Sequence, residues 1–269
     1  MTNKLSLAMS APDTRACLDI LRSYDGLVGS AEVRVDQMQS CDLPLLIAES
    51  PLPLVITCRP VREGGAFRGP EEERLALLRR AMELGCAYVD VEWDSAAALE
   101  RPRGSATQVI VSRHWFDRTP PDLLALEGEL RPLADVVKLV GTVREPGDLI
   151  PVLELLRGAR GPVIAIGMGA QGALTRVVAP CFPAALLTYG AGQGVAATAP
   201  GQLTVEAMRE RYHLHLAGPH TRLRLHHDAD PDALLHGSGA PDGTLLDLHL
   251  PEGEEYRRAA HIIMRNYNS

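Results

Sequence analysis

One lysine stands inside an apolar segment of the sequence. Lys138 occupies the middle of DVVKLVG (135–141), where the flanking valines and leucine indicate a buried strand. Burying an ammonium group is costly unless its charge is neutralised or used in chemistry. Apart from Lys4 it is the only lysine of the chain, and an arginine cannot act as an amine nucleophile because it stays protonated. Lys138 is therefore a candidate for imine formation with a ketone or aldehyde. The alternative is a strand-end lysine that reaches solvent.

His114, in VSRHWF, is the second candidate for chemistry. Eight of the nine histidines lie between His213 and His261, so His114 is the only histidine of the first 212 residues. On a strand next to that of Lys138, it would supply the general acid and base that an imine mechanism needs. Glu63, in REGGAFRG, could orient the imidazole through a hydrogen bond. The structural alternatives are a core histidine bonded to the backbone and, for EGG, a simple tight turn.

Eight short β-rich runs could position these residues. Most of them are continuously apolar rather than alternating, which is typical of parallel strands covered on both faces. They span residues 5–9, 31–35, 53–58, 87–93, 108–114, 135–140, 162–168 and 185–190. Helical segments are indicated at 13–23, 70–85, 119–133 and 145–158, whereas the segments after the second and fourth strands are ambiguous. The alternation predicts an α/β fold, a (β/α)8 TIM barrel over residues 1–215, with an open doubly wound sheet as the alternative.

In such a barrel, reactive side chains lie at or just beyond the C-terminal ends of the strands. The residues at those positions are Glu32, Arg34, Arg59, Glu63, Glu92, His114, Lys138 and Met168. Arg176 follows the seventh strand closely enough to face the same mouth, and the loop GAGQGVAATAPGQ follows the eighth. The sequence therefore predicts that the ionisable side chains gather on one face of the barrel.

Composition argues against several kinds of partner and compartment. The 269 residues carry a formal net charge of −7 with a pI near 5.7, which disfavours nucleic acid and anionic membranes as main partners. The five cysteines are scattered without CxxC spacing, so neither a disulfide framework nor a zinc site is indicated, and a reducing cytoplasm fits best. No apolar run is long enough for a signal peptide or a membrane-spanning helix.

The segment 216–269 differs in composition and is predicted to be a C-terminal extension of unknown role. It is rich in His, Asp, Gly and Pro, with possible strands at 221–226 and 244–250 and an amphipathic helix at 254–266. HLH at 213–215 and the pair His226–His227 offer metal-binding side chains. No third ligand is spaced along the sequence to complete a site, so we expect no metal.

Several ordered motifs resemble the type I 3-dehydroquinate dehydratases of the shikimate pathway. The motifs are AEVRVD, ITCRPVREGGAFRG, AMELGCAYVDVE, IVSRHWF, ADVVKLV, PVIAIGMGAQG, LTRVVAP and TAPGQLTVEAMRERY, running from residue 31 to residue 212. The resemblance implies a lyase without a cofactor that converts the small molecule 3-dehydroquinate into 3-dehydroshikimate. It also implies a TIM barrel that assembles as a homodimer.

The resemblance implies a role for each matching position. Lys138 would form the imine with the C3 ketone, and His114 would remove a C2 proton and protonate the departing C1 hydroxyl. Glu63 would hold His114, and Arg176 would bind the substrate carboxylate. The other substrate-binding residues that it implies are Glu32, Arg34, Arg59, Thr198, Gln202 and Met168.

The chain departs from the usual family pattern on both sides of His114. Arg113 stands where Tyr or Asn is more usual, and Trp115 stands where the family usually has an acidic residue. The extension has no GxGxxG motif and is too short to supply the shikimate dehydrogenase domain found in some relatives. Two other functions stay open, a Schiff-base aldolase acting on another ketone and a catalytically weakened homologue that binds a pathway intermediate as a sensor.

Overall fold

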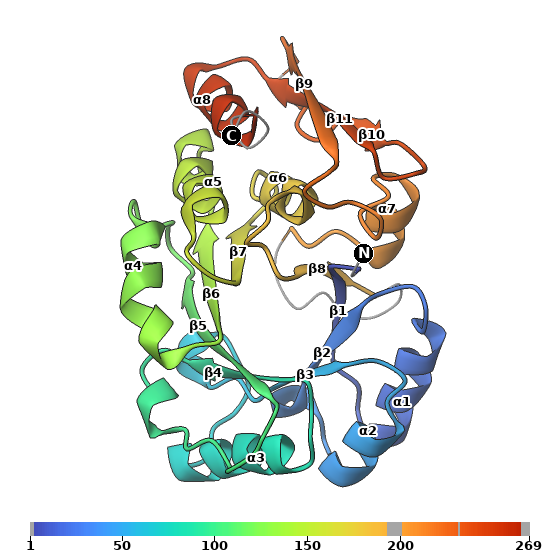
Figure 1. Ribbon diagram of the computed structural model, residues 1–269, viewed down its shortest axis with the longest axis vertical. Coiled ribbons are helices and arrows are strands. Elements are labelled where there is room, and N and C mark those ends of the chain that lie inside the picture. Colours follow the sequence, from blue (N-terminus) through green and yellow to red (C-terminus); the bar gives the residue numbers. More distant parts are fainter. Residues whose placement is uncertain (1–2, 193–200, 231, 265–269) are drawn as a thin grey trace.

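Eight parallel strands surround a common axis, with helices outside them (Figure 1). The computed structural model describes residues 3–192, 201–230 and 232–264. The strands are β1 (Leu5–Met9), β2 (Ser30–Arg34), β3 (Leu54–Thr57), β4 (Tyr88–Glu92), β5 (Gln108–Trp115), β6 (Val136–Thr142), β7 (Val163–Met168) and β8 (Thr188–Ala191). Their order, β7-β6-β5-β4-β3-β2-β1-β8, follows the sequence around a ring. The predicted TIM barrel is therefore confirmed, and the doubly wound alternative is wrong.

The ring closes between β7 and the segment leading into β8. Val163 forms a parallel bridge with Ala185. The Val163 N–H donates to the Ala184 carbonyl at 2.8 Å, and the Leu186 N–H donates to the Val163 carbonyl at 2.9 Å. The following residues pair with β1. The eighth predicted run, 185–190, thus makes contacts with both edges of the sheet.

Helices fill most of the connections between the strands. They are α1 (Thr14–Ser23), α2 (Leu43–Glu49), α3 (Glu71–Glu83), α4 (Leu123–Leu130), α5 (Leu149–Gly158), α6 (Ala173–Val178) and α7 (Val205–Glu210). Asp13 caps α1 by accepting from the Ala16 N–H, and three glutamates in the first turn of α3 complement the helix dipole. Of the two ambiguous connections, the first contains α2, whereas the second contains only the 3-10 turn Ala96–Ala98.

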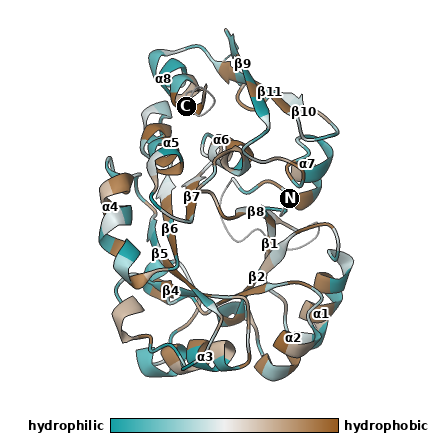
Figure 2. Cartoon of the chain, viewed as in Figure 1, coloured by the Kyte–Doolittle hydropathy of each residue, from teal (hydrophilic) through white to brown (hydrophobic). Residues whose placement is uncertain are grey.

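The barrel has an inner and an outer core, because alternate side chains of each strand point into the barrel and out toward the helices. The inner core contains Ala8, Val55, Ile110, Val136, Val140, Ile164, Ile166, Met168, Leu187 and Tyr189. The outer core lies between the strands and the helices, whose apolar sides are visible in Figure 2. Lys138 lies between Val136 and Val140 and shares their direction, so its side chain enters the barrel interior.

Residues 222–264 form a C-terminal unit of one small sheet and one helix. The strands are β9 (Arg222–Asp228), β10 (Gly237–Gly239) and β11 (Leu245–Pro251), with β11 central, parallel to β9 and antiparallel to β10. The helix α8 (Glu254–Met264) packs against α5 (Figure 1). The two predicted strands and the predicted helix are present, and β10 is an element that the sequence did not indicate. The predicted division after residue 215 falls between α7 and β9.

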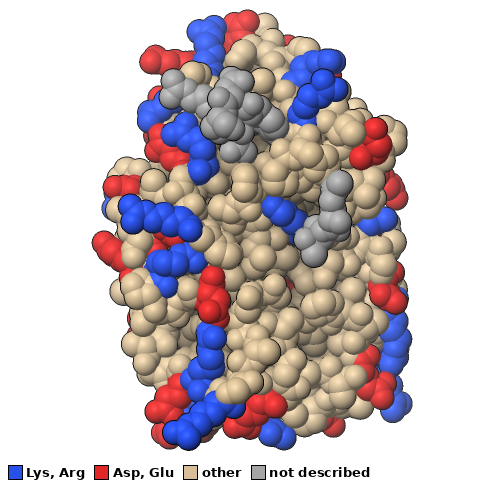
Figure 3. Space-filling view, in the orientation of Figure 1, with Lys and Arg blue, Asp and Glu red and all other residues tan. Residues whose placement is uncertain are grey.

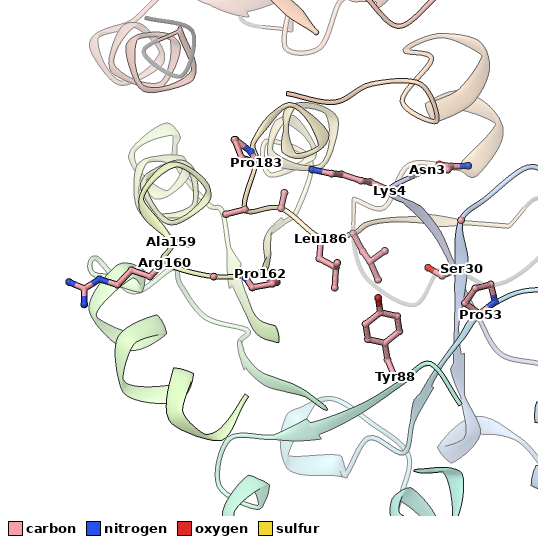
Figure 4. A pocket seen from close by; sticks show the side chains of 15 residues that line it. Asn3, Lys4, Ser30, Pro53, Tyr88, Ala159, Arg160, Pro162, Pro183 and Leu186 are labelled. Atoms are coloured by element: carbon pink, nitrogen blue, oxygen red, sulfur yellow. The ribbon is translucent and has the colours of Figure 1, made fainter. Parts of the chain in front are cut away.

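A cavity of about 680 Å³ lies at the N-terminal end of the barrel (Figure 4). Ser30, Pro53, Tyr88 and Pro162 line it, and each stands at or just before the first residue of a strand. Lys4 also lines it, but its Nζ is bound by the carbonyls of Pro180 and Phe182 at 3.3 and 3.0 Å, and burial lowers its pKa. This cavity therefore lies at the end opposite to the one where a TIM barrel carries its chemistry.

The outer surface mixes charges of both signs. Figure 3 shows basic and acidic side chains interspersed on the face in view, without a broad basic patch. Across the three described ranges, no helix combines the length and apolar character needed to cross a membrane.

Candidate active site

Lys138 is buried against two carboxylates. Its Nζ donates to Glu32 Oε1 at 3.1 Å and to Asp90 Oδ2 at 2.8 Å, and it lies 4.8 Å from the centre of the Tyr189 ring. Only 4% of Lys138 is exposed, so the alternative of a lysine that reaches solvent is wrong. The two carboxylates and the ring face take the place of water around the ammonium group.

Arg59 links these carboxylates to a deeper ionic layer. Its guanidinium lies 2.9 Å from Asp90 and 2.6 Å from Glu92, and Arg74 of α3 pairs with the second oxygen of Glu92. Burial raises the pKa of Glu92 to about 7, against the effect of Arg59. For Asp90, burial acts in the same direction, but the charges of Arg59 and Lys138 outweigh it and hold the pKa below its usual range. Asp90 is thus an ionised partner of Lys138.

His114 lies on β5, the strand next to β6, and contacts Glu63 twice. Its Nδ1 is 3.0 Å from Glu63 Oε2, and its backbone N–H donates to the same oxygen at 2.9 Å. The loop of Glu63 depends on Gly65, where an added Cβ would stand 1.9 Å from the carbonyl oxygen of Arg59. EGG is therefore a tight turn, and that turn presents Glu63 to His114.

The imidazole of His114 is held in its neutral form. Burial and the charge of Arg59 lower its pKa to about 4, although the hydrogen bond to Glu63 acts in the opposite direction. With Nδ1–H donating to Glu63, the unprotonated nitrogen is Nε2. His114 can therefore act as a base through Nε2 at neutral pH.

We expect Glu63→Gln to lower turnover roughly 100-fold and to move the acid limb of the kcat/KM profile to lower pH. The hydrogen bond to Glu63 raises the pKa of His114, and a neutral glutamine accepts a weaker hydrogen bond from an imidazolium than a carboxylate does. The imidazole of the variant would therefore stay neutral further below pH 4. A pH profile of kcat/KM for both proteins measures the shift, and an unmoved acid limb would show that Glu63 does not act through His114.

Arg176 and Arg34 differ in how their guanidinium groups are occupied. Arg176 is 2% exposed, donates from Nη1 to the Tyr189 carbonyl at 3.3 Å, and has an Nε without a partner among the described residues. Burial lowers its pKa to about 10, so it remains a cation at neutral pH. Arg34 is held by Asp36 through two bonds of 2.9 and 2.7 Å. Arg176 is the better placed of the two to bind a carboxylate.

One pocket brings the predicted site residues together. Those that line it are Glu32, Arg34, Arg59, Glu63, His114, Lys138, Met168, Arg176 and Gln202. Thr198 lies outside the described residues. Glu92, also expected near the mouth, does not line the pocket because it is buried with Arg59 and Arg74. Gly64, Phe116, Tyr189, Ala8, Val140 and Ile166 complete the lining.

The sequence reasoning missed Asp90, Phe116 and Tyr189. Asp90 carried a usable signal, because it is a charged residue inside the apolar run AYVDVEW, as Lys138 is inside its own run. Phe116 stacks on His114 with 6.1 Å between ring centres and 11° between the planes. The two aromatic residues carried no such signal, since the sequence does not distinguish them from core residues.

The barrel can also be compared with known proteins. The model of the type I 3-dehydroquinase family matches residues 7–218. The chain belongs to this family. The 3-dehydroquinate dehydratase of Desulfotalea psychrophila is 36% identical over 221 residues, which cover 77% of this chain and 96% of that protein.

Two further relatives are longer proteins, and the match covers only part of each. The 3-dehydroquinate dehydratase of Pyrobaculum aerophilum is 39% identical over 70% of this chain and 64% of that protein. The chloroplastic bifunctional 3-dehydroquinate dehydratase/shikimate dehydrogenase of Arabidopsis thaliana is 34% identical over 71% of this chain and 34% of that protein. The chain thus spans less than two thirds of the length of these two relatives.

Solved structures support the fold assignment. The 3-dehydroquinate dehydratase of Geobacillus kaustophilus aligns with a TM-score of 0.67 at 24% identity, covering 77% of this chain and 89% of that chain. The dehydroquinate dehydratase and shikimate dehydrogenase of S. pombe aligns with a TM-score of 0.68 at 25% identity, covering 94% of this chain and 52% of that one. At 94% coverage, the second alignment must extend past residue 218 into the C-terminal unit.

The two departures from the usual type I 3-dehydroquinase pattern contact each other. The guanidinium carbon of Arg113 lies 4.0 Å from the ring centre of Trp93 and 4.8 Å from that of Trp115. Arg113 and Trp115 alternate with His114 along β5, so they point away from the pocket that His114 lines. The stack therefore joins the ends of β4 and β5 behind the pocket.

We expect Arg113→Ala to lower the free energy of unfolding by about 1–2 kcal/mol, since each cation–π contact contributes about 0.5–1 kcal/mol. Turnover should stay within about threefold, because the side chain faces away from the pocket. Denaturant unfolding and steady-state kinetics measure the two effects. A loss of turnover without a loss of stability would instead place Arg113 in the function of the pocket.

Proposed function

We propose that this protein is a hydro-lyase that dehydrates 3-dehydroquinate to 3-dehydroshikimate through an imine on Lys138. The observation that carries the proposal is the buried lysine on β6 beside a neutral, Glu63-bound histidine on β5 in one pocket. Membership of the type I 3-dehydroquinase family supports the same reaction. The imine itself accepts the electrons that the reaction displaces, so the proposed chemistry needs no cofactor.

The proposed reaction begins with the amine of Lys138. After His114 has taken a proton from the ammonium, the free amine attacks the C3 carbonyl. The His114 imidazolium returns this proton to the hydroxyl of the resulting carbinolamine, which departs as water and leaves a protonated imine beside a neutral His114. The protonated imine draws electrons from C2 and makes the C2 proton acidic. Asp90 and Glu32 already flank Nζ, so their charges also stabilise the positive imine.

His114 then moves the proton that completes the elimination. Nε2 removes the C2 proton and leaves an enamine, and the imidazolium gives a proton to the C1 hydroxyl, which departs as water. The enamine electrons form the C1–C2 double bond and restore the imine. Hydrolysis of the imine releases 3-dehydroshikimate and frees Lys138. Glu63 stabilises the transient imidazolium.

The remaining pocket residues would bind and orient the ring. Arg176 would form a two-bond contact with the substrate carboxylate, since its Nε lacks a partner in the described chain. Met168 would supply an apolar wall. Glu32, Arg34 and Arg59 would bind the hydroxyls and orient the ring. Thr198 and Gln202, which follow β8 in the sequence, would also contact the substrate.

Ultraviolet absorbance and borohydride trapping test the proposal together. With 3-dehydroquinate we expect the absorbance of the conjugated product to rise, and in the presence of borohydride we expect loss of activity and an adduct on Lys138 by mass spectrometry. The only other lysine is Lys4, so the adduct is easy to place. An adduct without turnover would favour the weakened homologue that binds an intermediate. If the absorbance does not rise and no adduct forms, the proposal is contradicted.

We also propose a homodimer in a reducing cytoplasm. None of the five cysteines, all of which lie in the described residues, forms a disulfide, which agrees with a reducing compartment. Light scattering tests the assembly. A homodimer gives about twice the chain mass of 29.1 kDa, and a single-chain mass would contradict it.

A further inference from the structure

Three metal-ligand side chains meet on the small sheet of the C-terminal unit. One ligand atom each of His226, Asp247 and His249 lies within 4.8 Å of the other two. His226 Nε2 is 2.8 Å from Asp247 Oδ1, and the two imidazole centres are 4.9 Å apart. We propose that these three residues bind a divalent transition-metal cation, with zinc as the first choice.

The parallel register of β9 and β11 creates this cluster. His226 is paired directly with His249, and Asp247 precedes His249 by two residues. Residues two apart on a strand share one face, so all three side chains stand on the same side of the sheet. The opposite side carries the buried residues Leu246 and Leu248. The cluster therefore lies on the open face of the sheet.

The spacing of the ligand atoms fits a cation after small side-chain movements. Zinc bonds of about 2.0–2.1 Å in a tetrahedral arrangement place ligand atoms about 3.4 Å apart. The distance between His226 Nε2 and Asp247 Oδ1 would have to increase by about 0.6 Å on binding. The longest distance between two ligand atoms of the cluster would have to decrease by at most about 1.4 Å. The side chains of His226, Asp247 and His249 are 45%, 31% and 39% exposed, so they have room to rotate. The same exposure leaves a coordination position for water.

Two neighbouring residues orient the ligands. Asp228 Oδ2 lies 3.4 Å from Nδ1 of His249, as a carboxylate commonly does beside a metal-binding histidine. Arg224 donates to Asp247 Oδ2 at 3.1 Å and leaves Oδ1, the oxygen next to His226, for the cation. Arg224 is 61% exposed, so solvent weakens its repulsion of a bound cation.

The donor set selects the class of metal. Two imidazoles and one carboxylate suit zinc, cobalt, nickel and copper, whereas magnesium and calcium prefer oxygen ligands. A cation here would tie β9 to β11 on the face opposite to their apolar packing. Lys138 and His114 lie in the barrel pocket and contribute nothing to this cluster. We therefore expect the metal to stabilise the C-terminal unit and to leave the chemistry at Lys138 unchanged.

Titration of the untagged full chain with Zn²⁺ after chelator treatment tests the inference. We expect one ion per chain with a dissociation constant of about 10 µM or tighter. His226→Ala combined with His249→Ala should weaken binding by about 100-fold. The matched control combines His220→Ala with His261→Ala, two exposed histidines outside the cluster, and should bind like the parent. Absence of binding to the parent chain, or equal losses in both variants, would overturn the proposal.

A cobalt spectrum gives an answer that does not depend on how well the variants fold. Co²⁺ added to the parent chain should give the intense visible bands of four- or five-coordinate cobalt with nitrogen ligands. Asp247→Asn, the milder change, should weaken these bands, and circular dichroism checks that its fold is kept. The weak spectrum of hexahydrated cobalt at saturating protein would overturn the site.

Discussion

Lys138→Met is expected to lower turnover of 3-dehydroquinate by about ten-thousand-fold or more and to abolish the borohydride adduct. Methionine fills a similar volume but has no amine, so no imine can form and the C2 proton stays weakly acidic. Product absorbance and mass spectrometry after borohydride treatment measure both effects. An adduct of normal yield in this variant would move the imine to Lys4 and contradict the role of Lys138.

Lys138→Arg is the matched control because it keeps a cation beside Glu32 and Asp90. Its guanidinium stays protonated and cannot form the imine, so turnover should be lost as in the methionine variant. Parent-like turnover in the arginine variant would show that Lys138 acts as a charge and not as a nucleophile. The two variants together separate the charge of Lys138 from its nucleophilicity.

Lys138→Met should also be less stable than the parent protein. Lys138→Met removes one of the cations that neutralise the buried Glu32 and Asp90 and leaves Arg59 beside them. The free energy of unfolding should therefore fall by about 3 kcal/mol at neutral pH. Charges such as that of Lys138 outweigh burial and hold the pKa of both carboxyls low in the folded protein. Their stabilisation is therefore present above the pKa of the unfolded chain and lost as pH falls through the folded pKa.

The stability difference between parent and methionine variant should therefore shrink on acidification. Chemical denaturation at neutral and acid pH measures this trend. A difference that grows toward acid pH would contradict the ionised state of Asp90.

The barrel could be predicted because its strands are covered on both faces. Continuous apolar runs such as PLVITC and PVIAIGM mark parallel strands. Charged residues inside such runs then become conspicuous, which is how Lys138 was found. Asp90 has the same signal, two residues before the end of β4, but only Glu92 is expected at the mouth from that strand.

The contacts between strands were harder to predict. The pairing of Lys138 with Asp90 and Glu32 joins β6 to β4 and β2, and nothing in the three segments taken singly specifies those distances. His226 and His249 show the same limitation. Their sequence separation suggested no ligand set, but the parallel register of β9 and β11 makes them neighbours. Side-chain clusters of this kind depend on the register between neighbouring strands. The spacing of residues along the sequence does not determine that register.

His114→Ala is expected to cut turnover by about a thousand- to ten-thousand-fold while substrate binding stays largely intact. Alanine removes the base that takes the C2 proton, but Lys138 and its carboxylate partners remain in place. Substrate affinity by calorimetry and single-turnover kinetics separate binding from chemistry. Undiminished turnover would remove His114 from the mechanism.

Trapping distinguishes this variant from those at Lys138. In His114→Ala, the imine can form slowly and then cannot lose its C2 proton, so borohydride should capture an adduct at Lys138 in the absence of product. The variant should also lose the acid limb near pH 4 that the low pKa of His114 imposes on kcat/KM. A retained acid limb would assign that titration to another group, with Glu32 as the first carboxylate to test because it also contacts Nζ.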